Sequence, residues 1–349
     1  MKMDDIARLA NVSKSAVSLA LNGKPGISME TRMKIINIAK ESGYTPRAQT
    51  RTEKTSGSSN ILRFVACTHS GIVLEHYAQQ PFFMELIHCF EEQCRSNGYS
   101  LFFSSVPSDQ LEQQIGQLET ENESSGIILL GTNLSKEQIR LISGKQPNLV
   151  VLDTCYETEQ ANFVVMNNRM GAYQGAKHLL DSGHRRIGYV QSQYRMYNFD
   201  MRRQGFLACL EEHGVAFDER DAFTASPTVV AAYPDLVELF RRRSGDLPTA
   251  LFCECDYIAI SVIKSLTEAG LRVPDDVSVV GFDNIHEAVV ISPELTTIHV
   301  EKETIAELAV RKLMGMIEHN DQVTVKTMVD THLVIRKSSR PLLEQVSQM

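Results

Sequence analysis

The chain has 349 residues, of which 43% are hydrophobic and 22% charged, and its formal net charge is −8. This composition is typical of a globular protein, and no stretch approaches the roughly 20 consecutive apolar residues that a membrane-spanning helix needs. The N-terminus lacks the apolar segment of a secretion signal, and the seven cysteines are odd in number and scattered, so we expect reduced thiols and a cytoplasmic location.

Residues 1–46 carry three short helical patterns, each with apolar side chains on one face. These apolar positions are Ile6, Leu9, Ala10, Val17, Ala20, Leu21, Met33, Ile35, Ile36 and Ala39. Asn11 and Val12 separate the first two patterns, and Ser13 and Ser28 stand at the N-cap positions of the second and third. The patterns predict a small all-α helix-turn-helix head.

The second helix of this head has the side chains expected of a DNA reader. It begins with Lys14, Ser15 and Ala16, which offer a cation, a hydroxyl and a methyl group, and Ser18 and Asn22 lie further along it. Groups of these kinds at the start of a helix read base edges in the major groove.

The charge of the chain is distributed unevenly. Residues 1–54 hold ten lysines and arginines against five acidic residues, a net charge of +5, which leaves −13 on the remainder. A basic head on an acidic body predicts that the head alone binds a polyanion such as DNA. Residues 47–60 include the polar run TEKTSGSSN, which predicts a flexible linker between head and body.

Residues 61–349 alternate between apolar runs and helical patterns. The expected strands are Ile61–Cys67, Leu101–Phe103, Gly126–Gly131, Leu149–Asp153, Arg186–Val190, Thr249–Cys253 and Val277–Asp283. The expected helices include Phe82–Asn97, Arg169–Ser182, Met201–His213 and Tyr257–Ala269. This alternation predicts an α/β fold of parallel sheets covered on both faces. Because the units exceed one sheet, we expect two doubly wound lobes, the first of residues 61–160 and 292–320 and the second of residues 161–291 and 321–340.

Polar side chains follow several predicted strands, where doubly wound folds bind their ligands. Asp153, Asp256 and Asp283 each come directly after or close behind a strand. A carboxylate in this place accepts hydrogen bonds from sugar hydroxyls or an amine, or caps the following helix. We expect Asp256 to be a cap and Asp283 to contact a ligand. Cys253 and Cys255 have no second pair at zinc-like spacing, so we expect them to be structural or to line the cleft, with no metal or cofactor.

Residues 4–46 resemble the lac-repressor/galactose-repressor (LacI/GalR) family of bacterial transcription regulators. The resemblance lies in D-I-A-x-x-A-x-V-S-x-x-x-V-S-x-x-L-N-G, S-x-E-T-R and G-Y-x-P. It implies that Lys14, Ser15 and Ala16 meet operator bases. It implies phosphate contacts or head packing for Ser13, Ser18, Asn22, Ser28, Thr31 and Tyr44. Many relatives have arginine in place of Leu19, so we expect one guanine contact to be lost.

The body resembles the same family and, through it, the periplasmic sugar-binding-protein fold. The matching segments include P-F-F at 81–83, H-L-L-D-S-G-H-R-R-I-G-Y-V at 178–190, V-P-D-D-V-S-V-V-G-F-D-N at 273–284 and S-P-E-L-T-T-I at 292–298. The resemblance implies a clamshell that dimerises and binds a small polar effector, a sugar or related metabolite. It also implies that Arg202 and Asp283 bind the effector, and we expect them to face each other across the cleft. We further expect that replacing either residue leaves folding without ligand largely intact. Phe82 and Phe83 would form an apolar wall, unless they are plain core residues.

These patterns predict a sequence-specific transcriptional regulator, which we expect to be a repressor. It would bind a near-palindromic operator as a homodimer and respond to its effector. The alternative is a cytosolic solute-binding protein whose head has no DNA-binding role, against which the head charge argues. An enzyme is not expected, because G-x-S-x-G, G-x-x-x-x-G-K-[ST] and H-E-x-x-H are absent from the sequence. The operator, the effector and the direction of its effect stay open.

The linker departs from the family at one position. Relatives carry a leucine, seven residues after the proline that corresponds to Pro46, which wedges into the minor groove, whereas this chain has Glu53. A carboxylate beside phosphates is repelled and cannot act as an apolar wedge. We therefore expect a linker that stays largely unstructured without DNA, and a less sharply bent operator.

Overall fold

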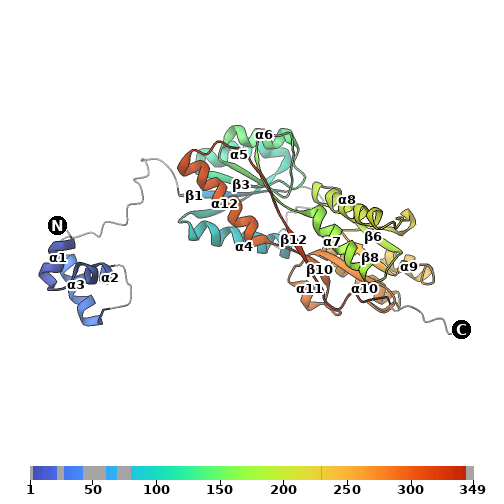
Figure 1. The fold of residues 1–349 in the computed structure, drawn as a ribbon. Helices are drawn as coiled ribbons and strands as arrows, with labels where there is room; N and C mark the ends of the chain where they lie inside the picture. The colour runs from blue at the N-terminus through green and yellow to red at the C-terminus, as the bar shows by residue number, and fades with distance from the viewer. Residues whose placement is uncertain (1–2, 22–26, 42–59, 69–79, 229, 343–349) are drawn as a thin grey trace. The chain divides into compact units, whose positions relative to one another are not determined.

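The computed structural model describes residues 3–21, 27–41, 60–68, 80–228 and 230–342 (Figure 1). The chain divides into two compact units, Met1–Ser58 and Ser59–Met349. We call the first unit the head and the second the body.

The head contains the three predicted helices, α1 (Met3–Ala10), α2 (Lys14–Leu21) and α3 (Met29–Glu41). The core between them is made of small and β-branched side chains: Ile6, Ala7, Ala10, Val17, Ala20, Ile35 and Ala39. Two predicted core residues are wrong, since Leu9 is 61% exposed and Met33 53% exposed. Because α1 packs against both α2 and α3, the small Ala7 faces them instead of Leu9.

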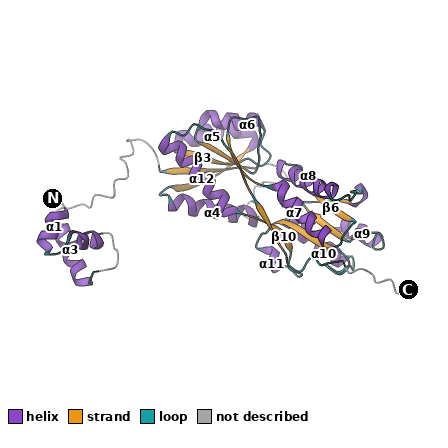
Figure 2. Cartoon of the chain, in the orientation of Figure 1, coloured by secondary structure: helices purple, strands orange, loops and turns teal. Residues whose placement is uncertain are grey.

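The body contains two six-stranded sheets with helices on both faces, as predicted (Figure 2). The first sheet, lobe one, has the order β11-β5-β4-β3-β1-β2, with all its strands parallel. Its strands are β1 (Ile61–Thr68), β2 (Ser100–Pro107), β3 (Gly126–Leu130), β4 (Leu149–Leu152), β5 (Asn162–Met166) and β11 (Lys326–Val329). Its helices are α4 (Pro81–Ser96), α5 (Leu111–Glu121), α6 (Lys136–Lys145) and α12 (Lys302–His319).

The second sheet, lobe two, has the order β12-β10-β9-β8-β6-β7, and β12 alone runs antiparallel to its neighbour. Its strands are β6 (Ile187–Ser192), β7 (Ala222–Ala225), β8 (Ala250–Cys253), β9 (Ser278–Asp283), β10 (Thr296–Val300) and β12 (Thr331–Val334). Its helices are α7 (Asn168–Asp181), α8 (Tyr197–Glu212), α9 (Pro234–Arg242), α10 (Asp256–Glu268) and the single turn α11 (Glu287–Val290). The short elements η2 (Ser108–Gln110) and η3 (Glu219–Asp221) complete the body.

The apolar strands are buried on both faces because each sheet lies between two helical layers. In β1, Phe64 belongs to the core shared with α4, whereas Val65 belongs to the core shared with α5 and α6. Successive side chains of a strand point to opposite faces of the sheet. In a strand that helices cover on both faces, every side chain is therefore buried, which favours apolar residues at all positions. This explains why β1, β3, β4, β8 and β9 were predictable from their continuous apolar runs.

The predicted lobe boundaries are wrong in three places. Residues 162–166 form β5 in lobe one, 296–300 form β10 in lobe two, and 326–329 form β11 in lobe one. The chain therefore crosses between the lobes after β5, after β10 and after β11. A short apolar strand fits the edge of either sheet equally well. The lobe to which it belongs depends on the strand with which it pairs, and this pairing is a feature of the tertiary structure.

Close helix packing in lobe two positions the beginnings of α7 and α8 next to each other. A Cβ atom on Gly205 of α8 would lie 2.1 Å from the carbonyl oxygen of Arg169 on α7, so only glycine fits there. As a result Asn168 at the start of α7 and Asn198 in the first turn of α8 come within hydrogen-bond distance.

Candidate effector cleft and DNA-reading helix

The turn before α2 is built as the sequence predicted. Asn11 has a φ of 54°, and the Ser13 hydroxyl accepts a hydrogen bond from the Ala16 backbone N–H at 3.2 Å. Lys14 and Ser15 are exposed and Ala16 is half-buried. The start of α2 thus presents the predicted base-reading side chains to solvent, while Ser13 holds the helix end in place.

Ser28 and Thr31 form the corresponding start of α3. The Thr31 N–H donates to the Ser28 hydroxyl at 3.2 Å, and the two hydroxyl groups lie 2.8 Å apart. Ser28 therefore caps α3, as the sequence predicted. The side chains of Ser18 and Leu19, and the residues Asn22, Tyr44 and Glu53, lie outside the described part of the structure.

In the body, a chain of buried polar groups runs from lobe one into lobe two. Its members, each hydrogen-bonded to the next, are Thr132, Asp153, Asn198, Asn168, Arg202 and Asp283. Thr132 and Asp153 follow β3 and β4 of lobe one, and Asp283 ends β9 of lobe two. The carboxyl ends of both sheets thus meet at one polar site, as expected for doubly wound lobes.

Arg202 is buried in the cleft, and most of its partners belong to lobe two. Its guanidinium donates to Asn168 Oδ1 at 2.9 Å and to Asp283 Oδ1 at 3.1 Å, and it lies 3.7 Å over the ring of Phe282. Its side chain is 2% exposed and that of Asp283 is 8% exposed. The expectation that Arg202 and Asp283 face each other across the cleft is therefore wrong, because both belong to lobe two and pair directly.

Contacts that cross between the lobes involve Arg202 and Asp283 as well as other residues. Arg202 donates to the sulfur of Met166 in β5 at 3.2 Å, and Lys302 of α12 donates to the Asp283 backbone carbonyl at 3.3 Å. Asn198 of lobe two donates to the Asp153 carboxylate of lobe one. The Phe82 N–H at the start of α4 donates to the Tyr257 hydroxyl of α10 at 3.0 Å. Glu85 of α4 accepts a bond from the backbone N–H of His286 at 3.3 Å. These bonds connect the two walls of the cleft in the arrangement that the structure describes.

Asp256 does not cap its helix, contrary to expectation. It is the first residue of α10, and its carboxylate accepts bonds from the Ile285 N–H at 3.0 Å and the Thr297 hydroxyl at 2.6 Å. A Cβ on Gly281 would lie 2.2 Å from this carboxylate, so the glycine of β9 makes room for it. Asp256 therefore ties α10 to β10 and to the segment after β9, the strand that ends with Asp283.

Burial sets the protonation of the cleft carboxyls. It raises the pKa of Asp283 to about 6, although the positive charges of Arg202 and Lys302 oppose the shift. Burial also raises the pKa of Asp153, against the bonds from Thr132 and Asn198. Within the described residues, Asp153 accepts its hydrogen bonds from the neutral Thr132 and Asn198, so a ligand that donates hydrogen bonds would favour its charged form.

The predicted aromatic wall lines a small inner cavity of about 40 Å³. It is lined by Gln80, Phe82, Phe83, Asp153, Met196, Asn198, Phe199, Arg202, Pro227, Cys255, Tyr257 and Asp283. Phe82 and Phe83 are 6% and 7% exposed, so they are core residues and cavity walls at once. At about 10–15 Å³ for each water molecule, this volume holds only a few waters. A ligand as large as a sugar ring enters only if the lobes or side chains move.

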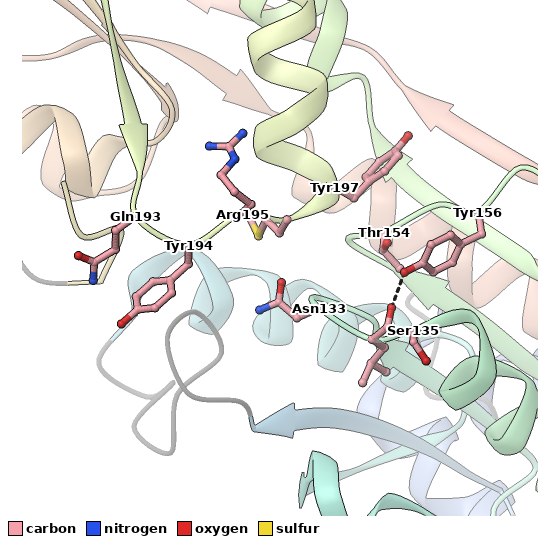
Figure 3. A pocket seen from close by; sticks show the side chains of 10 residues that line it. Asn133, Ser135, Thr154, Tyr156, Gln193, Tyr194, Arg195 and Tyr197 are labelled. Atoms are coloured by element: carbon pink, nitrogen blue, oxygen red, sulfur yellow. Dashed lines mark hydrogen bonds between the residues drawn. The ribbon is translucent and has the colours of Figure 1, made fainter. Parts of the chain in front are cut away.

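A larger outer pocket of about 530 Å³ lies beside it, between the lobes (Figure 3). Lobe one contributes Asn133, Leu134, Ser135, Thr154 and Tyr156, and lobe two contributes Gln193, Tyr194, Arg195, Met196 and Tyr197. The lobe-two residues and Asn198 lie in the aromatic-rich stretch QSQYRMYNFDM before Arg202, a departure from the family that the sequence places at the cleft without naming single contacts. Sequence reasoning missed Thr132 and the residues from lobe one.

Backbone strain gathers at the same place. Among the described non-glycine residues, those with positive φ include Asn133 (65°), Asp153 (65°), Asp283 (115°) and Asn284 (53°). All four follow or end a strand at the cleft. Such conformations persist where the surrounding structure enforces them, and they cluster at binding sites.

The cysteines of the segment 253–255 are buried, and Cys255 lines the inner cavity. Burial raises the pKa of both thiols, which makes them unreactive. No group of three metal-binding side chains was found among the described residues. In that same part of the chain, no helix is both long and apolar enough to cross a membrane.

Known proteins resemble the chain in both of its units. Residues 2–47 match the description "Bacterial regulatory proteins, lacI family", and residues 176–339 match "Periplasmic binding protein-like domain". The HTH-type transcriptional repressor PurR of Mannheimia succiniciproducens is 31% identical over 340 residues, covering 97% of this chain and 98% of the relative. The ribose operon repressor of Haemophilus influenzae is 30% identical over 338 residues, covering 96% and 98%.

Solved structures share the fold. A complex of the transcriptional regulator CelR with cellobiose has a TM-score of 0.69 at 23% identity, over 97% of this chain and all of the other. The lac repressor dimer bound to operator and the anti-inducer ONPF has a TM-score of 0.67 at 22% identity, over 97% and 99%. With a helix-turn-helix head, a two-lobed body and full-length relatives that are transcriptional repressors, the chain belongs to the LacI family of bacterial regulatory proteins, which act on DNA and are not enzymes.

Proposed function

We propose that the protein is a repressor that binds a near-palindromic operator as a homodimer and releases or tightens that contact when a small uncharged polyol binds between its lobes. Operator binding places it in the cytoplasm. One α2 helix reads too few base pairs for genomic selectivity, and two-fold symmetry doubles the number. The observation that carries the effector part is the Asp153–Asn198 bond, because it joins the two lobes inside the cleft.

The proposed effector contacts are Phe82, Phe83, Arg202 and Asp283, with Asp153 and Asn198 added from the geometry. The inner cavity is lined by two carboxylates and one guanidinium, and the Asp283 carboxylate already accepts a hydrogen bond from that guanidinium. The nearby Lys302 is paired with Glu85 at 3.2 Å, so both cations beside the cavity already have a carboxylate partner. A phosphorylated or carboxylated ligand would compete with these partners, whereas hydroxyl groups would donate to Asp153 and Asp283. This favours a neutral sugar or a related polyol over an anionic metabolite.

A ligand that bonds to Asp153 or Asn198 would compete with their bond across the cleft. It would therefore change the relative stability of the open and closed arrangements of the lobes, and with it the affinity for DNA. Couplings of this kind are typically about 1–3 kcal/mol, or roughly 5–150-fold in operator affinity.

The test selects operators from random DNA with the full-length protein and measures their binding by fluorescence anisotropy with and without a panel of sugars and sugar phosphates. We expect a two-fold symmetric consensus, steep salt dependence, and a change of at least fivefold with a neutral sugar. Asp283→Asn should remove the sugar response, whereas Asp181→Asn, on the exposed face of α7, should keep it. An asymmetric consensus bound by a monomer would refute the dimer, and a response only to sugar phosphates would refute the neutral effector.

A further inference from the structure

The outer pocket adjoins the inner cavity. Met196 lines both, and the consecutive residues Asp153 and Thr154 line the inner and outer spaces respectively. The outer volume of about 530 Å³ lies within the range of about 300–1,000 Å³ that small-molecule sites occupy. The inner cavity is much smaller and more apolar. A ligand that reaches Asp153 therefore has space to continue outward past Met196.

The outer pocket offers flat rings and neutral hydrogen-bonding groups. Tyr156, Tyr194 and Tyr197 supply rings from both lobes, and amide and hydroxyl groups come from Asn133, Ser135, Thr154 and Gln193. The Tyr156 hydroxyl donates to the Leu134 carbonyl at 2.7 Å, which fixes its ring (Figure 3). Aromatic faces pack against the C–H face of a sugar ring while amides and hydroxyls bond its edge.

Arg195, the one cation among the described residues that line the pocket, is already neutralised. Arg195 donates to both oxygens of Glu254 at 2.8 and 2.9 Å and to Asp200 at 2.8 Å, and its side chain points away from Asn133 in Figure 3. Phosphate or carboxylate groups thus find no free positive charge in this lining. The pocket suits an uncharged ring.

The wall that carries two of the tyrosines is rigidly held. Glu254 is fully buried and also accepts bonds from the Ser192 N–H at 2.6 Å and the Tyr189 hydroxyl at 2.9 Å. One carboxylate therefore anchors the chain at Ser192 and at Arg195, on either side of Tyr194. On the facing lobe, Asn133 has a φ of 65°. The bonds to Glu254 preorganise the wall from lobe two, which lowers the entropy cost of binding.

From this geometry we propose that the outer pocket is a second sugar subsite, so that the effector is a neutral ligand of two linked rings, one at the inner polar site and one between Tyr156, Tyr194 and Tyr197. The inference rests on the proposed function, because it places the first ring at the proposed effector site. Glu254 is a positioning residue, since it acts through Ser192 and Arg195.

The test compares sugars of one and two rings on the full-length protein: glucose and galactose against cellobiose, maltose and lactose. The chain has no tryptophan, so Tyr197→Trp gives a fluorescence reporter of the outer pocket alone. We expect one disaccharide to bind at least tenfold more tightly than its monosaccharides by calorimetry, and to shift the Trp emission, which monosaccharides leave unchanged. Tyr194→Ala, at a side chain 41% exposed, should erase most of this tenfold advantage. Tyr173→Ala, on α7 and outside both cavities, should keep it.

Two results distinguish failure of the second subsite from failure of the proposed effector site. If monosaccharides bind and change operator affinity but disaccharides gain nothing, or if Tyr194→Ala weakens both classes equally, the second subsite is refuted and the proposed effector site stands. If no sugar of either class binds, the second subsite and the sugar effector are both refuted.

Discussion

Replacing Arg202 with alanine tests whether the proposed effector residue also holds the body together. From the sequence, its loss should leave unliganded folding intact. Its burial predicts the opposite, since Arg202→Ala leaves the buried Asp283 without its cation and removes the bonds to Asn168 and to the Glu254 carbonyl. Breaking a buried ion pair from one side costs about 3–5 kcal/mol. With an unfolding entropy of about 2.1 cal/mol/K per residue, that lowers the Tm of a body of this size by roughly 5–8 °C.

The measurement is thermal unfolding of the full chain without ligand, followed by circular dichroism at pH 7. The neighbouring Arg203 is the control, because its pair with the 73%-exposed Glu219 contributes at most about 1 kcal/mol. The double variant Arg202→Met/Asp283→Leu should recover part of the loss, since neither charge then stays buried alone. An Arg202→Ala protein that unfolds within 2 °C of the Arg203→Ala protein would refute this reasoning.

Three further predictions concern pH and DNA. Burial raises the pKa of Asp256 to about 8, so its contribution to the free energy of unfolding is fully present below about pH 4 and is lost as pH rises through about 8. Asp256→Asn should flatten the dependence of Tm on pH between 4 and 9. An unchanged slope would contradict the raised pKa of Asp256. Lys14→Ala and Ser15→Ala should relax base preference by about 1–3 kcal/mol each in competition binding, whereas equal losses on all sequences would make them phosphate contacts. Glu53→Leu should tighten operator binding and increase the bend seen by gel mobility, and weaker binding would overturn the view that its carboxylate is repelled by phosphates.

The sequence by itself determined the parts of this protein that depend on local patterns. The caps Ser13 and Ser28 act on backbone N–H groups within three residues, so their spacing is sufficient to predict them. Strands such as β3 and β9 are predictable because continuous burial demands continuous apolar residues. Placing Asp283 and Asp153 at the cleft followed from the rule that ligands meet the carboxyl ends of parallel strands.

Tertiary structure decided which of those groups meet. Arg202 and Asp283 pair within one lobe, whereas Asp153 and Asn198, 45 residues apart in the chain, join the two lobes. Asp256 has the sequence context of a helix cap, yet it bonds Thr297, because Gly281 leaves space for its carboxylate to turn toward β10. A polar side chain binds whichever complementary group the packed elements bring within about 3 Å, and that partner is set by how sheets and helices stack, which local sequence does not encode.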